Sequence, residues 1–159
     1  MKDTVIIGID SGANGGIAIM CGGITPLAFA PKNAQEINDA LQTAKAYADK
    51  KGLNVVAFFE SLTGYQKGRY IPSQRAFVMG KFYGMVIGSL VSLGIEFRSV
   101  TPQEWQADHE DCKDKVYASH KRLLTRKAKA LFPRMKITGK TADAILIANF
   151  GKGVLSHEA

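Results

Sequence analysis

The chain has 159 residues, of which 46% are hydrophobic, a size that suits one domain with a single core and leaves little for a second. Its two cysteines, Cys21 and Cys112, form no ligand-like spacing, which argues against a disulfide framework or a zinc site. We see no secretory signal and no apolar run of membrane-spanning length, so we expect a soluble protein of the cytoplasm, the nucleoid or a phage-infected cell, without a membrane partner.

The formal net charge is +7, and the excess is concentrated in one part of the chain. Up to Glu60 six acids face five bases, whereas from Lys113 to Lys140 ten Lys and Arg face one acid, Asp114. This segment is either a solvated helix face or a surface for a polyanion such as a nucleic acid.

The N-terminal third has the pattern of an antiparallel meander. Thr4–Asp10 is an apolar run that ends in a carboxylate, and Gly15–Cys21 and Thr25–Phe29 follow it as two shorter strands. Gly22 and Gly23 are typical of the hairpin between those two strands.

A helix and a second buried strand come next. Asn33 with Glu36 forms a capping-box pattern, and Gly52 ends the helical segment. Asn54–Glu60 is again an apolar strand that ends in an acid.

The segment Ser73–Leu93 predicts a long helix that ends at Gly94. Small residues recur on it every four positions, at Gly80, Gly84, Gly88 and Ser92. Such a stripe lets another backbone approach closely, either the chain's own sheet or the same helix of a second copy in a homodimer.

The last third combines one strand with three helices. We predict a strand at Glu96–Val100, a short helix capped by Thr101 and Glu104, a basic helix at Lys113–Leu131 and a final helix from Thr141 to Phe150. The inner side of the basic helix is expected to carry Val116, His120, Leu123, Leu124, Ala128 and Leu131.

These elements predict an α/β fold with a mixed five-stranded sheet, in which three antiparallel strands precede two parallel ones and helices cover both faces.

Asp10 and Glu60 each end a strand, and if those strands are parallel neighbours their ends lie roughly 5 Å apart. Asp143, in the first turn of the final helix, can reach the same point. Three carboxylates there would bind Mg²⁺ or Mn²⁺, and two ions about 4 Å apart would support hydrolysis of a phosphodiester. Alternatively, each acid only caps a strand or complements a helix dipole.

Six segments together resemble RuvC-like Holliday junction resolvases, nearest to the phage and organelle-type members. They are IIGIDSGANGGIAIM, FFESLTGYQ, SQRAFVMGKFYGMVIG, VTPQEWQ, KRLLTRKAKALFP and TADAILIANFG, and they occur in the same order over nearly the whole chain. The resemblance implies a ribonuclease H-like fold and a homodimeric, Mg²⁺-dependent endonuclease that nicks four-way DNA junctions symmetrically.

By position, the resemblance assigns Asp10, Glu60 and Asp143 to the family's metal-binding acids. The family carries a fourth acid or a histidine three or four positions before the last aspartate, where this chain has Gly139 and Lys140. We therefore expect Lys140 to hold the scissile phosphate or orient water, to mark a weakened enzyme, or to be an ordinary exposed lysine.

Several cationic and aromatic residues are candidates for DNA contact. In the loop Thr63–Arg69, an aromatic residue beside two cations suits stacking on an unpaired base, although a solvated loop has the same composition. The complete set of predicted DNA contacts is Tyr65, Lys67, Arg69, Arg75, Lys81, Lys121, Arg122, Arg126, Lys127 and Lys129.

Three other functions remain compatible with parts of this pattern. The segment GIDSGANGG also occurs in ATP-binding phosphotransferases, although these need a second lobe for which the chain is too short. The missing fourth acid favours a junction-binding protein with weakened or lost catalysis. A third option is another ribonuclease H-like nuclease that acts on forks or RNA/DNA hybrids.

Two further features are interpreted as structural. The segment ADHEDCKD, residues 107–114, is expected to be a solvated connector, and Trp105 is expected to anchor the core.

Overall fold

The structure is a computed structural model that describes residues 4–12, 15–22, 26–62, 71–113 and 116–158. Five strands form one mixed sheet in the order β3-β2-β1-β4-β5. The strands are β1 (Thr4–Ile9), β2 (Ile17–Met20), β3 (Leu27–Phe29), β4 (Asn54–Glu60) and β5 (Glu96–Val100). The pairs β1–β2 and β2–β3 are antiparallel, whereas β1–β4 and β4–β5 are parallel, which confirms the predicted topology.

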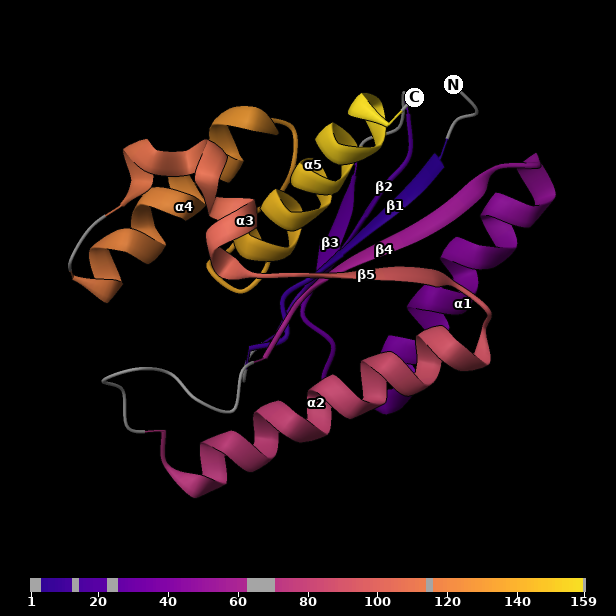
Figure 1. The fold of residues 1–159 in the computed structure, drawn as a ribbon, viewed down its shortest axis with the longest axis horizontal. Helices are drawn as coiled ribbons and strands as arrows, with labels where there is room; N and C mark the ends of the chain where they lie inside the picture. The colour runs from indigo at the N-terminus through magenta and orange to yellow at the C-terminus, as the bar shows by residue number, and fades with distance from the viewer. Residues whose placement is uncertain (1–3, 13–14, 23–25, 63–70, 114–115, 159) are drawn as a thin grey trace.

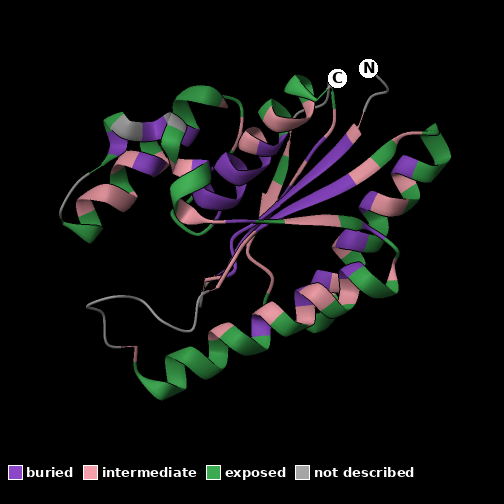
Figure 2. Ribbon diagram, viewed as in Figure 1, coloured by how far each residue is buried: buried purple, intermediate pink, exposed green. Residues whose placement is uncertain are grey.

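Helices cover both faces of the sheet (Figure 1). They are α1 (Ala34–Lys51) and α2 (Ser73–Ser92) on one face, and α3 (Pro102–Gln106), α4 (Tyr117–Leu131) and α5 (Ala142–His157) on the other. Each face has its own apolar cluster, and alternate residues of β1 point into one or the other. The central strands and α5 are therefore buried while the outer helix faces are exposed (Figure 2), as the continuous apolar runs predicted.

The predicted helix ends are formed by side-chain and glycine caps. Asn33 Oδ1 accepts a hydrogen bond from Glu36 N at 2.9 Å, and Gly52 ends α1 with a φ of 66°. Glu36 Oε2 accepts from the backbone of Lys32 instead of closing the capping box on Asn33. At α3 the box is complete, because Thr101 Oγ1 accepts from Glu104 N and Glu104 Oε2 accepts from Thr101 N.

The basic helix and the segment before it differ from the prediction. Helix α4 begins at Tyr117, so Val116 precedes it and is 60% exposed, and Leu131 at its end is 44% exposed. The expectation that both lie on the inner side is wrong. The expected solvated connector contains a 3₁₀ helix, Ala107–Cys112, whose His109 and Cys112 side chains are buried.

Helix α5 continues past Phe150 to His157 although it contains glycine, a poor helix former. At Gly151 an added Cβ would lie 2.3 Å from the ring of Phe58, so only glycine allows this close packing on β4. Among the described residues, no helix is long and apolar enough to cross a membrane.

The small-residue stripe of α2 faces outward. A Cβ added at Gly80, Gly84 or Gly88 would meet no atom within 4 Å, and the side that packs on the protein carries Phe82, Val86 and Leu90 instead. The interpretation that this stripe packs on the chain's own sheet is therefore wrong.

Helix α5 lies directly on β1 at Gly8, where an added Cβ would be 2.1 Å from the carbonyl oxygen of Ala144 and 2.4 Å from Ala148 N. We expect Gly8→Ala to lower the free energy of unfolding by about 3 kcal/mol, because backbone atoms must move apart. Gly153→Ala on the same helix, where the added Cβ meets no atom within 4 Å, should be neutral or stabilising by up to about 1 kcal/mol. Equal urea midpoints for the two variants would contradict this packing account.

Candidate metal and active site

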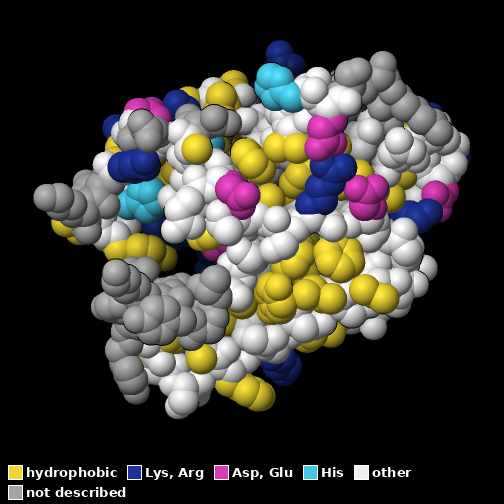
Figure 3. All heavy atoms as spheres, viewed as in Figure 1, with side chains coloured by type: hydrophobic (Ala, Val, Ile, Leu, Met, Phe, Trp, Pro, Cys, Tyr) yellow, Lys and Arg dark blue, Asp and Glu magenta, His cyan; other side chains and the backbone are white. Residues whose placement is uncertain are grey.

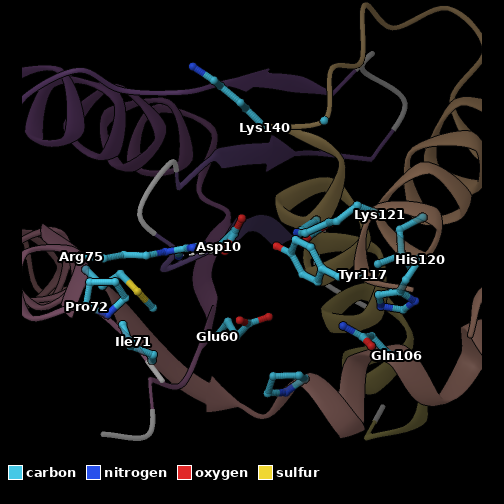
Figure 4. A pocket seen from close by; sticks show the side chains of 16 residues that line it. Asp10, Glu60, Ile71, Pro72, Arg75, Gln106, Tyr117, His120, Lys121 and Lys140 are labelled. Atoms are coloured by element: carbon cyan, nitrogen blue, oxygen red, sulfur yellow. Dashed lines mark hydrogen bonds and ion pairs between the residues drawn. The ribbon is translucent and has the colours of Figure 1, made fainter. Parts of the chain in front are cut away.

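Three acids from separate parts of the chain meet at one edge of the sheet. Strands β1 and β4 are parallel with Ile9 opposite Phe59, so the next residue of each strand, Asp10 and Glu60, lies at the same edge. Asp143 reaches this edge from the first turn of α5. Asp10 is only 9% exposed and Asp143 only 4%, and all three acids line one cleft of about 590 Å³ (Figure 4).

Each acid is held by one specific contact. Asp10 Oδ1 accepts from Gly12 N at 2.9 Å, and Glu60 Oε2 accepts from the indole Nε1 of Trp105 at 2.8 Å. Asp143 Oδ2 forms an ion pair with Lys121 Nζ. These contacts fix the orientation of the carboxylates before any ligand binds.

The residues fit a divalent cation at this position. The second oxygen of Asp143, Oδ1, is buried and has no hydrogen-bond partner within the described part of the chain. A buried acceptor without a partner costs free energy, and a cation beside it removes that cost. Within the same described residues, no group of three or more His, Cys, Asp or Glu side chains is already arranged as a finished metal site. The fit therefore rests on the unpartnered oxygen of Asp143 and on the carboxylate chemistry of the three acids.

The electrostatics of the cleft also favour a bound cation. Burial raises the pKa of Asp10 to about 6, and the charge of Asp143 contributes in the same direction. Burial likewise raises the pKa of Glu60 to about 7, with a further contribution from Asp10. Carboxylates that repel one another in a buried place are the setting in which Mg²⁺ or Mn²⁺ stabilises the ionised form.

Lys121, which we predicted as a DNA phosphate contact, lies in the cleft. Its side chain is 30% exposed, and its ammonium group is paired with Asp143. Burial alone would lower its pKa, but the charges of Asp143 and Asp10 outweigh that effect and raise it, so the lysine stays charged. The sequence does carry a signal for this position, because Lys121 shares the inner helix face with Leu124 and Ala128, three and seven positions on.

Lys140 does not join the acids. Its side chain is exposed and points away from Asp10 and Glu60 (Figure 4), although the residue lies on the rim of the cleft. Its backbone packs on the start of β2, where a Cβ added at Gly16 would lie 2.4 Å from the Lys140 carbonyl oxygen. The structure thus places a lysine beside the acids, but from α4 and not from the position before α5.

The other predicted DNA contacts lie at several places. Arg75 extends into the cleft from α2 (Figure 4), and Lys81 is exposed farther along that helix. On α4 Lys127 pairs with Asp111 at 3.1 Å. Exposed cations of the same helix are Arg122, Arg126 and Lys129. The remaining predicted contacts, Tyr65, Lys67 and Arg69, lie outside the described residues.

The sequence reasoning missed several residues of the cleft wall. Trp105 is fully buried, as a core anchor should be, yet it also holds Glu60. Tyr117 and His120 line the cleft from α4, and Gln106 lines it from α3. His120 Nδ1 lies 2.8 Å from the Cys112 carbonyl oxygen, which orients the imidazole. No local motif marks these positions, because their place depends on how α3 and α4 dock on the sheet.

The raised pKa of Asp10, about 6 against 3.8 in an unstructured chain, makes the stability of the metal-free protein depend on pH. A raised carboxyl pKa favours folding below the unfolded value, and that contribution is lost as the pH rises through the folded value. In chelator at about pH 8 we expect Asp10→Asn to be more stable than wild type by roughly 1–3 kcal/mol, with the difference shrinking toward about pH 4.

Added Mg²⁺ should then stabilise wild type but not Asp10→Asn, as measured by thermal unfolding across the pH range. Asp39→Asn, at an exposed position of α1, is the control and should follow wild type in both buffers. A metal-free Asp10→Asn protein that is less stable than wild type at about pH 8 would contradict the account of charge repulsion.

Comparison with known proteins supports the fold. No protein-family model and no curated protein sequence matches the chain. Among solved structures, it is similar to Thermus thermophilus RuvC in complex with a Holliday junction substrate, with a TM-score of 0.61, 12% identity, and coverage of 97% of this chain and 96% of that one. A second Thermus thermophilus RuvC structure matches with a TM-score of 0.59, 13% identity and the same coverage. The chain therefore has the ribonuclease H-like fold of these RuvC structures.

Proposed function

We propose that this protein is a metal-dependent endonuclease that resolves four-way DNA junctions. The observation that carries the proposal is the convergence of Asp10, Glu60 and Asp143, from β1, β4 and α5, in one cleft. The pKa values of Asp10 and Glu60 are raised there. The fold shared with a RuvC that was solved with a Holliday junction supports branched DNA as the substrate.

In this proposal the three acids hold Mg²⁺, for which Mn²⁺ substitutes. When bound, the ion supplies Lewis-acid activation of the scissile phosphate and of the attacking water. Gly12 N and the Trp105 indole keep Asp10 and Glu60 turned toward the cleft, so little reorganisation is needed. Arg75, which lines the cleft from α2, would hold the backbone phosphate.

The DNA duplex arms would lie along the exposed cations of α4. The exposed cations of this helix are Arg122, Arg126 and Lys129. Lys121 lies on the inner side of the same helix, where it pairs with Asp143 in the cleft. Such cations position phosphates without reading sequence, which suits an enzyme that selects for branched shape. The high net charge of +7 is consistent with a polyanionic partner.

A second candidate is a junction-binding protein without strong catalysis. It is favoured by the orientation of Lys140 away from the acids and by the lack, within the described residues, of a group already arranged as a metal site. Both candidates bind a four-way junction, and only the endonuclease cuts it. A third candidate, a nuclease for forks or RNA/DNA hybrids, differs in which substrate it cuts fastest.

We expect wild type to nick a synthetic four-way junction symmetrically with Mg²⁺ or Mn²⁺, faster than a fork, an RNA/DNA hybrid or a linear duplex. Asp10→Asn and Glu60→Gln should slow nicking by roughly 1,000-fold, because a lost ligand removes several kcal/mol of transition-state stabilisation. Junction binding in a gel-shift assay should persist, and Asp39→Asn should cut normally. Wild-type activity in either acid variant would contradict the proposed site, and binding without cutting by wild type would favour the second candidate.

Symmetric nicking needs two active sites, and we propose that two copies pair through α2. Gly80, Gly84 and Gly88 are open to a second backbone, and Ser92 is exposed. Phe77 and Val91 on the same helix are 72% and 64% exposed. Hydrophobic side chains also gather where α2 passes the edge strand β5 (Figure 3). An exposed apolar surface beside a small-residue stripe is typical of a helix-packing interface.

Gly84→Leu should weaken this self-association about tenfold or more, because the added side chain holds the two helices apart. The measurement is the monomer–dimer equilibrium in analytical ultracentrifugation, with thermal unfolding as a check on folding. Gly153→Leu, at an open position on α5, is the matched control. A folded Gly84→Leu protein with an unchanged dissociation constant would remove α2 as the interface.

A further inference from the structure

We infer that Lys121 takes the place of a second metal ion, so that each chain holds one divalent cation and one fixed ammonium group in its cleft. This inference rests on the proposed function, and it departs from the two-ion arrangement expected from the sequence. It starts from one contact, the ion pair of Lys121 Nζ with Asp143 Oδ2 inside the cleft.

The charges of the cleft balance with a single divalent ion. Asp10, Glu60 and Asp143 carry three negative charges when ionised, and one divalent ion together with the Lys121 ammonium carries three positive charges. A second divalent ion would leave an excess of positive charge beside a lysine that is already paired. One divalent ion therefore makes the cleft neutral before DNA binds.

The described residues that line the cleft include no fourth carboxylate for a second ion. Beyond the three acids, the side chains there with a possible oxygen or imidazole ligand atom are neutral ones, Gln106, Tyr117 and His120, and His120 Nδ1 is 2.8 Å from the Cys112 carbonyl oxygen. The two positions before Asp143 where an acid would complete the set hold Gly139 and Lys140, and the Lys140 side chain points away. Mg²⁺ is usually bound through one or two carboxylates together with water and phosphate oxygens, so a second ion would have to share these three carboxylates with the first.

The position of Lys121 is fixed by the fold. Leu124 and Ala128, on the same side of α4, are buried in the core, and α4 packs against α5, which carries Asp143. An ammonium group has three donors, and the Asp143 pair uses one of them. Within the described residues no other hydrogen bond of Lys121 Nζ is present, so the other two donors can reach a phosphate oxygen in the cleft. Binding that oxygen is the task that a second metal ion performs in a two-ion site.

The alternative is that Lys121 only fastens α4 to α5. A purely structural ion pair would affect stability when removed, but it would not decide how many metal ions the cleft accepts. The number of bound ions is therefore the readout that separates the two roles.

The experiment counts Mn²⁺ bound per chain by electron paramagnetic resonance, with and without a four-way junction, on samples frozen before turnover. The Mn²⁺ that the four-way junction binds without protein is measured separately and subtracted from this count. Wild type should bind one Mn²⁺ per chain without the spin coupling of a metal pair. Lys121→Glu, which replaces the ammonium with a carboxylate, should bind two coupled ions. Lys45→Met, which removes a lysine–aspartate pair from α1, is the control and should bind one.

A coupled pair of Mn²⁺ ions in wild type would overturn this inference and leave the proposed nuclease intact. A folded Lys121→Glu protein that still binds one ion would also overturn it. No specific Mn²⁺ binding by wild type would overturn both the inference and the metal-dependent function. In addition, Lys121→Met should nick junctions about 100-fold more slowly while still binding one Mn²⁺, and an unchanged rate would contradict a role at the phosphate.

Discussion

The close contact between α5 and β1 is the constraint on which the site depends. At Gly8 the strand has no side chain, and the backbone of Ala144 occupies that space. Asp143 precedes Ala144, so this contact fixes how near the third acid comes to Asp10 and Glu60. A larger residue at position 8 would separate the helix from the sheet and with it the acids. The geometry of the cleft is thus set by backbone packing in the core.

The cleft concentrates negative charge that the fold alone does not neutralise. Burial and mutual repulsion raise the pKa of Asp10 to about 6 and that of Glu60 to about 7, and Lys121 offsets part of this effect. Because these acids lie close together, the free energy of unfolding of the metal-free protein is lower at neutral pH than it would be without their repulsion. Such local destabilisation is expected where a ligand supplies the missing interaction, and the ligand that we propose here is a divalent cation.

The strand and helix pattern of the fold, and the places of the three acids within it, could be predicted because they depend on local sequence patterns. Apolar runs that end in acids place Asp10 and Glu60 at strand ends, and caps such as Thr101 with Glu104 locate helix starts. Local patterns could not predict whether Lys140 or Lys121 lies beside the acids. Which lysine reaches the acids depends on the docking of α4 against α5 and on a loop whose backbone packs on Gly16. The outward direction of the α2 stripe likewise depends on which side of the helix packs on the sheet.

The central claim is that Asp10, Glu60 and Asp143 together hold a divalent cation. The most direct test is an anomalous difference map from crystals of the protein grown or soaked in Mn²⁺, collected at the manganese absorption edge. The account predicts a peak in the cleft contacted by an oxygen of each of the three acids, with the Lys121 ammonium beside Asp143. A cleft without a peak at saturating Mn²⁺, or a peak that touches none of these acids, would contradict it.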